Sequence, residues 1–335
     1  MKNIIIFGAT GTVGVYTALR LKQNGNNVIA AGKRKSDNGF FGDYDIPYFS
    51  VNISNEFNFN VLPQKNIDVV LHFAGAMPAR MKGYDPYVYV ESIVKGALNV
   101  LEYTRKVGAK KIIFTQSISD ILYLFGSEYP IPADAEIKFP LTGDHSIYSI
   151  SKNTAVNLIE HYFYEYGINR FILRLPTIYL YHPNPFYYVD GQKIWMAYRY
   201  LINQAICGRD IELWGNPESK KEIVYVKDFA QIAEKCVLSD SSGGVYNVGN
   251  GIGISMREQI QGIIDVFCSE RKKSKIIYRP ELKSSPQFIL DISKTKELGY
   301  ISQFDYKQYL IDFKEEMETE PFRKLWGESK DFIKE

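Results

Sequence analysis

The amino-acid sequence predicts an α/β protein with a doubly wound parallel sheet and a smaller C-terminal lobe. Two observations lead to this fold class. Short apolar runs alternate with amphipathic stretches through the first half of the chain, and the first apolar run ends in a glycine-rich turn. Strands that are apolar on both faces suit a parallel sheet, because helical crossovers cover it from both sides.

The expected elements follow one another in this alternation. Strands are expected at residues 3–7, 27–31, 69–73, 111–115 and 170–175, where apolar runs are short. Helices are expected at residues 13–24, 88–106 and 148–166, where apolar residues recur with helical spacing. The repeated order of strand, helix and strand is the order that a doubly wound sheet needs.

The pattern loosens after residue 176. Residues 179–188 are rich in aromatic residues and proline, and a helix is expected near residues 194–207. The aromatic side chains either stack on a nucleotide base or pack a lid, since such loops usually build a binding pocket. We therefore assign residues 1–175 to a dinucleotide-binding domain and residues 176–335 mainly to a substrate-binding lobe.

Later parts of the chain are expected to return to the first domain. Segments near residues 223–250 and 287–293 contain strand-like runs, so both are assigned to the main sheet's domain. The charged tail, residues 314–335, is expected to be a solvated helix.

Composition narrows the class of protein. The chain has 335 residues, of which 45% are hydrophobic, so it can bury a large core. Its 40 basic and 38 acidic residues leave a formal net charge of +2, which favours neither nucleic acid nor a membrane surface as partner. The four histidines show no spacing suited to a metal site, and no metal is expected.

The cysteines and the length of the apolar runs indicate the cellular compartment of the protein. Cys207, Cys236 and Cys268 are far apart and odd in number, which predicts neither a disulfide framework nor a zinc site. No apolar run approaches the roughly 20 residues of a membrane-spanning helix. We expect a cytoplasmic protein without a signal peptide or membrane span.

The glycine-rich turn is the first functional signal. It contains Gly8, Gly11 and Gly14 directly after the first expected strand. Gly8 permits a tight turn, Gly11 lets backbone amides approach a pyrophosphate, and Gly14 allows a helix to pack closely on the strand. At this position the pattern predicts that a dinucleotide lies at the helix N-terminus.

The end of the second strand bears on the choice between NAD and NADP. An NAD enzyme commonly has a carboxylate there, whereas this chain has Gly32, Lys33, Arg34 and Lys35. The cations either pair with the 2′-phosphate of NADP, Arg34 by a bidentate fork, or form a solvated basic turn. Of the two cofactors, the sequence favours NADP.

Tyr148 and Lys152 form the second functional signal. They are four residues apart and so lie on one face of the expected helix. An ammonium beside the tyrosine favours the tyrosinate and would lower the tyrosine pKa from about 10 toward neutrality. Together with the nucleotide signal, the pair predicts a general acid or base beside a dinucleotide.

In these motifs the chain resembles the extended short-chain dehydrogenase/reductases, the NAD(P)-dependent nucleotide-sugar epimerase/dehydratase family of Rossmann proteins. The resemblance spans most of the chain. Its motifs are the glycine loop at residues 8–14, His72 to Ala76, Gly96 to Leu101, Phe114 to Ser117, Tyr148 with Lys152, Tyr225 to Asp228, Tyr246 to Gly251, and Asp291 to Tyr300.

The resemblance implies roles for individual residues. Catalysis would fall to Ser117, Tyr148 and Lys152: Ser117 would bind the reacting oxygen, Tyr148 would exchange its proton, and Lys152 would hold the nicotinamide ribose. The cofactor would contact Gly8, Thr10, Gly11, Thr12, Val13, Gly14, Gly32, Lys33, Arg34, Asn52, Ile53, Phe73, Ala74, Gly75, Tyr148, Lys152 and Pro176. The sugar nucleotide would contact Ser117, Ser119, Thr177 and Lys221.

Some positions depart from the family pattern. Thr177 and Ile93 stand where the family commonly has asparagine, and Lys221 or Lys220 replaces an arginine. The acidic pair that follows the catalytic serine or threonine in the family's 4,6-dehydratases is absent, and Asp120 lies one residue too far along. Dehydration is therefore ranked below the other reactions.

The function expected from the resemblance is an NAD(P)-dependent nucleotide-sugar epimerase of carbohydrate metabolism that acts by transient oxidation at the sugar 4-position. The alternative is an NADPH-dependent nucleotide-sugar 4-ketoreductase, which the basic turn would suit. A dehydratase, or a nucleotide-binding sensor without turnover, is less expected. The family also leads us to expect a homodimer formed through two helices of each subunit.

Overall fold

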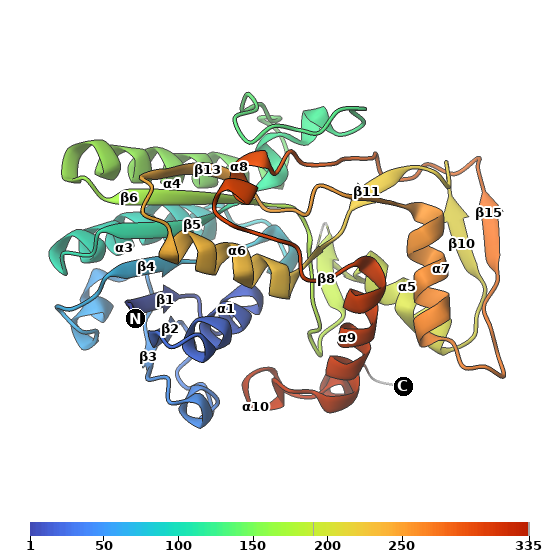
Figure 1. The fold of residues 1–335 in the computed structure, drawn as a ribbon, viewed down its shortest axis with the longest axis horizontal. Helices are drawn as coiled ribbons and strands as arrows, with labels where there is room; N and C mark the ends of the chain where they lie inside the picture. Colours follow the sequence, from blue (N-terminus) through green and yellow to red (C-terminus); the bar gives the residue numbers. More distant parts are fainter. Residues whose placement is uncertain (190, 334–335) are drawn as a thin grey trace.

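The computed structural model describes residues 1–189 and 191–333. Its main feature is a parallel sheet of seven strands in the order β13-β6-β5-β4-β1-β2-β3 (Figure 1). The strands are β1 (Asn3–Phe7), β2 (Asn27–Gly32), β3 (Tyr48–Ser50), β4 (Val69–His72), β5 (Lys111–Ser117), β6 (Asn169–Leu175) and β13 (Gly243–Asn247). The strand order reverses between β1 and β4, where open α/β sheets bind their ligands.

Helices cover both faces of this sheet, which confirms the predicted fold class. The α-helices of the described residues, of which α5, α7 and α9 lie in the C-terminal lobe away from the sheet, are α1 (Thr12–Gln23), α2 (Pro86–Tyr89), α3 (Gly96–Lys106), α4 (Asp144–Tyr166), α5 (Ala197–Ile206), α6 (Val226–Leu238), α7 (Met256–Phe267), α8 (Ser293–Glu297), α9 (Tyr306–Thr319) and α10 (Arg323–Trp326). Ile4 and Ile6 of β1 join a buried cluster with α1 and α6, whereas Ile5 and Phe7 join one with α3 and α4. The alternation places one cluster on each face.

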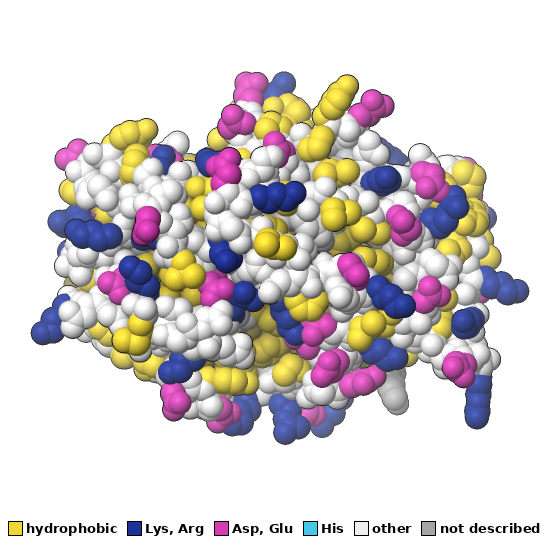
Figure 2. Space-filling model, in the orientation of Figure 1, with side chains coloured by type: hydrophobic (Ala, Val, Ile, Leu, Met, Phe, Trp, Pro, Cys, Tyr) yellow, Lys and Arg dark blue, Asp and Glu magenta, His cyan; other side chains and the backbone are white. Residues whose placement is uncertain are grey.

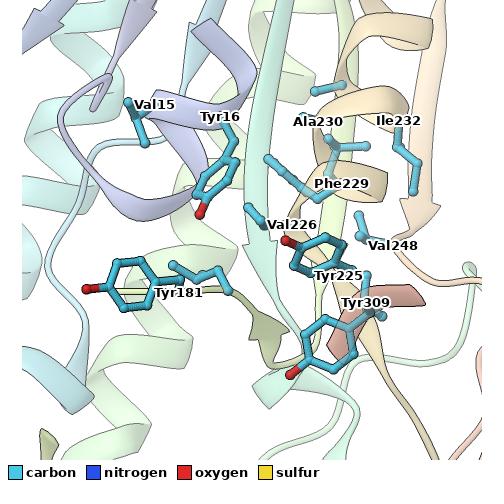
Figure 3. Packing of buried hydrophobic residues seen from close by; sticks show 14 of the residues in the cluster. Val15, Tyr16, Tyr181, Tyr225, Val226, Phe229, Ala230, Ile232, Val248 and Tyr309 are labelled. Carbon is cyan, nitrogen blue, oxygen red and sulfur yellow. The ribbon is translucent and has the colours of Figure 1, made fainter. Parts of the chain in front are cut away.

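The cluster on the α1 side reaches the C-terminal part of the chain. Figure 3 shows Tyr16 of α1 near Phe229 of α6, with Tyr309 of α9 farther along the same cluster. The Tyr16 hydroxyl donates a hydrogen bond of 2.6 Å to Glu316 Oε2 on α9. This buried contact ties α9 to the helix that follows the glycine loop.

The C-terminal lobe consists of short strand pairs and helices at one end of the molecule (Figure 1). β7 pairs with β12 and β10 with β15 in parallel, while β8 pairs with β9 and β11 with β14 in antiparallel. The bounds are β7 (Ile178–Tyr179), β8 (Phe186–Val189), β9 (Gln192–Trp195), β10 (Ile211–Trp214), β11 (Lys220–Glu222), β12 (Val224–Tyr225), β14 (Gly253–Ser255) and β15 (Ile276–Arg279).

The returning segments behave differently from one another. β13 joins the main sheet beside β6, but β12 pairs with β7 outside that sheet, and α6 begins directly after β12. Between residues 287 and 293, Phe288 and Leu290 form single bridges to Lys221 and Ile131, outside the main sheet. The domain boundary at residue 175 stays a prediction.

Two helices differ from expectation. Ile194 lies in β9, so the helix expected from residue 194 begins at Ala197. The tail expected to be a solvated helix contains the end of α9, up to Thr319, and the short helix α10, and Phe322 and Trp326 at the two ends of α10 are buried at 4% and 5% exposure. That expectation was wrong, because a few apolar residues among many charges dock on the first domain.

The surface agrees with the small net charge. On the face in Figure 2, Lys and Arg side chains alternate with Asp and Glu, and neither sign dominates a region. Among the described residues, no helix is both long and apolar enough to cross a bilayer.

Candidate active site

The glycine loop lies at the carboxyl end of β1 and makes close backbone contacts. Gly8 has φ of +88°, and a Cβ there would lie 2.7 Å from the Ala74 nitrogen. A Cβ at Gly14 would lie 2.2 Å from the Gly8 oxygen. Only glycine meets these two requirements, and the loop is thereby brought against the segment that follows β4.

The N-terminus of α1 offers a binding site for an anion. Gly11 is the N-cap and provides no side chain to satisfy the first amides, and the first turn contains no acidic residue. Thr12 and Val13, the first two helical residues, are half-buried. Free amides and the helix dipole favour a phosphate group here, so the loop fits the pyrophosphate of a dinucleotide.

The turn after β2 is fixed by Thr10 and Tyr48. A Cβ at Gly32 would lie 2.8 Å from Thr10 Oγ1, which explains why no side chain stands at the strand end. The Tyr48 hydroxyl donates to the Gly32 carbonyl at 3.1 Å and to the Arg34 carbonyl at 2.6 Å. Burial, with the charge of Asp37, raises the pKa of Tyr48 to about 12, so it stays a donor.

The basic residues of this turn are not equivalent. Lys33, Arg34 and Lys35 are all exposed. Of the three, Arg34 also donates a hydrogen bond, from Nη1 to the Leu325 carbonyl at 2.5 Å. The arginine that the sequence offered to a 2′-phosphate is therefore held by the C-terminal part of the chain.

The segments after β3 and β4 complete the expected cofactor crevice. The Asn52 side-chain oxygen accepts a hydrogen bond from the Ser54 amide, and Ile53 is buried. Phe73 packs on Phe229 with ring centroids 5.5 Å apart. Ala74 is partly exposed and Gly75 is exposed. Both lie beside the glycine loop, where the strand order of the sheet reverses. Their roles toward a cofactor stay predictions.

The structure brings the three predicted catalytic residues together. Ser117 ends β5, and Tyr148 and Lys152 lie one turn apart on α4. The Ser117 side chain is close enough to Tyr148 to lower the tyrosine pKa. Lys152 Nζ donates to the Thr115 carbonyl at 2.7 Å and lies 6.0 Å from the Tyr148 ring centroid. All three therefore meet at the edge of the sheet that also carries the glycine loop.

The pKa of Tyr148 is raised, whereas the sequence led us to expect that Lys152 would lower it. Burial raises the pKa of Tyr148 to about 12, and the Ser117 side chain only partly opposes it. Burial also lowers the pKa of Lys152 to about 7. In the ligand-free protein, then, burial outweighs the effect of the ammonium on the tyrosine.

A buried polar network behind Ser117 was not expected from the sequence. The Gln116 amide donates to Asn153 Oδ1 at 3.2 Å, and its oxygen accepts from the Ser117 amide at 2.8 Å. Asp120, the nearby carboxylate, is 3.1 Å from Arg174 Nε in a buried ion pair. These side chains fix the end of β5. Of the network, the sequence had indicated only Asp120, as a carboxylate one residue too far along for the acidic pair of the dehydratases.

The predicted sugar-nucleotide residues are dispersed. Ser119 accepts a hydrogen bond of 2.8 Å from Ser149 and adjoins the catalytic residues. Pro176 is buried and Thr177 exposed just beyond β6. Lys221 lies on β11 in the lobe, where burial lowers its pKa. None of the described contacts joins Thr177 or Lys221 to Tyr148.

His72 is a further buried group beside the site. Neither ring nitrogen has a hydrogen-bond partner among the described residues. Burial and the charge of Lys152 lower its pKa to about 3, so the ring is neutral, and it packs on Phe114 with centroids 5.3 Å apart. Among the described residues, no group of three or more His, Cys, Asp or Glu could hold a metal ion.

Comparison with known proteins identifies related sequences and folds. The model of the NAD dependent epimerase/dehydratase family matches residues 4–249. A putative UDP-glucose 4-epimerase of Methanocaldococcus jannaschii is 24% identical over 308 residues, which cover 91% of this chain and 95% of the relative.

Two solved structures share the fold over nearly their whole length. UDP-glucose 4-epimerase of Thermotoga maritima with UDP-glucose has a TM-score of 0.75 at 21% identity, covering 95% of this chain and 99% of that one. UDP-glucose 4-epimerase of Thermus thermophilus with NAD has a TM-score of 0.67 at 19% identity, covering 96% and 99%. At these identities the likeness shows the fold.

Proposed function

The chain belongs to the NAD dependent epimerase/dehydratase family, and we propose that it is a nucleotide-sugar 4-epimerase. One observation carries the proposal. Ser117, Tyr148 and Lys152 meet at the carboxyl edge of the sheet, on which the glycine loop also lies. The relatives named above are described as UDP-glucose 4-epimerases, which makes a UDP-sugar the first substrate to test.

The residues divide the work of proton transfer. Tyr148 removes the proton of the sugar 4-hydroxyl and returns it from its own hydroxyl, while Ser117 hydrogen-bonds the reacting groups. Lys152, held on the Thr115 carbonyl, positions the cofactor ribose. A bound oxidised nicotinamide supplies a positively charged hydride acceptor. That charge would favour the tyrosinate, which burial alone disfavours.

The alternative reactions would use the site differently. A dehydratase needs a further acid and base, but the Asp120 carboxylate is buried against Arg174. A 4-ketoreductase would consume NADPH. The sequence favoured this reaction only through the basic turn, where Arg34 is hydrogen-bonded to the Leu325 carbonyl. The preference for NADP expected from Lys33, Arg34 and Lys35 stays a prediction.

Replacement of Tyr148 tests the proposal. The purified protein is incubated with UDP-glucose, UDP-N-acetylglucosamine and UDP-glucuronate, and C4 epimers are followed by NMR. Tyr148→Phe should lower kcat by about 10³-fold or more, because the proton-transfer group is lost. Tyr123→Phe is the control, since the exposed Tyr123 hydroxyl bonds only the Glu136 carbonyl and should leave kcat unchanged.

The same assay separates the alternatives. Epimerisation of these sugars causes no net change in absorbance at the reduced nicotinamide band. A 4-ketoreductase acts on the same 4-hydroxyl sugars only in the reverse direction, and would convert added NADP⁺ to NADPH in step with the 4-keto sugar formed. Dinucleotide binding without turnover of any UDP-sugar would support the sensor. Substantial activity of Tyr148→Phe would contradict the role of Tyr148.

We propose a homodimer and a cytoplasmic location as well. Apolar side chains are exposed on two neighbouring helices, Leu98 on α3 and Ile150 and Tyr166 on α4, and we assign the subunit interface to these helices. A stable protein hides such a surface by association. Light scattering should give twice the chain mass, and Leu98→Glu with Ile150→Glu should give the monomer. The cytoplasmic location stays a prediction from the sequence.

A further inference from the structure

A closed ring of five hydrogen bonds joins the end of β5 to α4. On the β5 side, the Gln116 side-chain oxygen accepts from the Ser117 amide at 2.8 Å, and Gln116 Nε2 donates to Asn153 Oδ1 at 3.2 Å. On the α4 side, Asn153 Nδ2 donates to the Ser149 carbonyl at 2.8 Å, and Ser149 Oγ donates to Ser119 Oγ, also at 2.8 Å. The Ser119 amide closes the ring on Ser117 Oγ at 3.1 Å.

The ring is shielded from water and holds the predicted catalytic side chains in a fixed relation. Gln116 and Ser149 are each 3% exposed. A polar atom that lost its partner in such a place would destabilise the fold, because water could not replace the partner. Ser117 is itself a member of the ring, and Ser149 follows Tyr148 directly on the helix. The ring therefore couples the position of Ser117 to that of Tyr148.

The direction of the hydrogen bonds leaves two hydroxyl hydrogens outside the ring. Ser119 Oγ accepts from Ser149, and Ser117 Oγ accepts from the Ser119 amide. A serine hydroxyl carries one hydrogen, so each of these two oxygens keeps its hydrogen for another acceptor. The Ser117 side chain is close to Tyr148. None of the described residues accepts the Ser119 hydrogen, and Ser119 is partly exposed, so this donor is open to a bound molecule.

A donor at this place suits the oxygen on the reacting sugar carbon. As that oxygen gives its proton to Tyr148 it gains negative charge, and in the 4-keto sugar it is a carbonyl oxygen. In both states it accepts hydrogen bonds and has no hydrogen to donate. A hydrogen bond to a charged acceptor is stronger than one to a neutral hydroxyl. A fixed donor therefore lowers the barrier more than it tightens substrate binding.

We propose that Ser149 is a positioning residue of the reaction: by donating to Ser119, it turns the Ser119 hydroxyl hydrogen toward the oxygen on the reacting sugar carbon. Ser119 is then a second donor beside Ser117, and Ser149 acts only through Ser119. The inference rests on the proposed function, since it requires a sugar whose 4-oxygen reacts beside Tyr148. The sequence motifs assigned Ser119 to the sugar nucleotide and gave Ser149 no role.

A double-mutant cycle, measured with the UDP-sugar that the wild type epimerises, tests the proposal. Ser149→Ala should lower kcat about 10-fold and leave KM within about 2-fold, because the donor acts mainly after the proton begins to leave. Ser119→Ala should lower kcat by at least as much. The double variant should match Ser119→Ala within about 2-fold, since Ser149 has no effect once the Ser119 hydroxyl is absent.

Ser151→Ala is the matched control on the same helix. Ser151 is 1% exposed, and its hydroxyl has no hydrogen-bond partner among the described residues, so its removal should leave kcat unchanged. Multiplied losses in the double variant would overturn the proposal, because Ser149 would then act independently of Ser119. An unchanged kcat in Ser149→Ala, with or without a higher KM, would overturn it as well. Absence of turnover of every UDP-sugar by the wild type would instead overturn the proposed function.

Discussion

The two ends of the dinucleotide crevice are built in different ways. At the glycine loop, the tightest contact joins backbone atoms six residues apart, since a Cβ at Gly14 would lie only 2.2 Å from the Gly8 oxygen. At the turn after β2, the contacts join residues 291 positions apart, Arg34 and Leu325. The first end is an obligate local geometry, whereas the second depends on the docking of a remote segment.

This difference has consequences for substitution. Where backbone atoms leave no space for a methyl group, the backbone cannot shift to admit one, so any side chain there destabilises the fold. A docked segment can detach while the sheet remains folded, because its backbone pairs with none of the seven strands. Changes at the glycine loop should therefore affect folding and binding together, and changes in the segment should separate them.

Gly14→Ala should have the largest effect. Its Cβ would meet the backbone of Gly8 and Ala9, which cannot move without displacing α1 from β1. We expect a loss of more than about 3 kcal/mol in the free energy of unfolding, with loss of dinucleotide binding. Urea unfolding and titration with NADH measure both. Gly42→Ala is the control, since a Cβ at Gly42 meets nothing within 4 Å. Normal binding by a stable Gly14→Ala protein would refute the local requirement.

Trp326→Ala should have the next largest effect. The side chain is 5% exposed and its indole bonds Thr10, so we expect a loss of about 3 kcal/mol in the free energy of unfolding. Ile311→Ala on α9, where the side chain is 51% exposed, should cost less than about 0.5 kcal/mol. Equal small costs for both variants would mean that the tail is solvated, as the sequence had suggested.

The same contrast explains what could be predicted from the sequence. The strands and the need for glycine at positions 8 and 14 are local properties, so apolar periodicity and motif spacing were sufficient for the fold class. The spacing of Tyr148 and Lys152 likewise placed both on one helix face, and the structure brings Ser117 to them. The spacing of the glycines and of Tyr148 with Lys152 needs no knowledge of distant contacts, whereas the position of Ser117 beside them is a tertiary contact.

Other features depend on contacts that no local pattern encodes. The tail appeared solvated because charges outnumber its few apolar residues, and only the fold reveals the pocket beside Tyr16 and Phe40. Arg34 looked free because its acceptor is a backbone carbonyl of Leu325, which any residue could supply. The effect of burial on Lys152 also required the packed structure.

The smallest predicted effect concerns Lys152, whose place on the helix was predicted from the sequence. It is a change in the pH dependence of stability, caused by the burial of the ammonium group. Burial lowers its pKa to about 7 in the folded protein, whereas the unfolded value is about 10.4. Between these values the unfolded chain binds more protons, so stability should rise with pH. Relative to Lys152→Met, the wild type should gain about 2 kcal/mol between pH 7 and pH 9 in urea unfolding.

Lys110→Met is the matched control for this pH dependence. Lys110 is exposed and meets water in both states, so its replacement should leave the wild-type slope of stability against pH. Equal slopes for the wild type and Lys152→Met would mean that Lys152 keeps its charge when buried. The Thr115 carbonyl, 2.7 Å from Nζ, would then be enough to replace the water that the ammonium loses on folding.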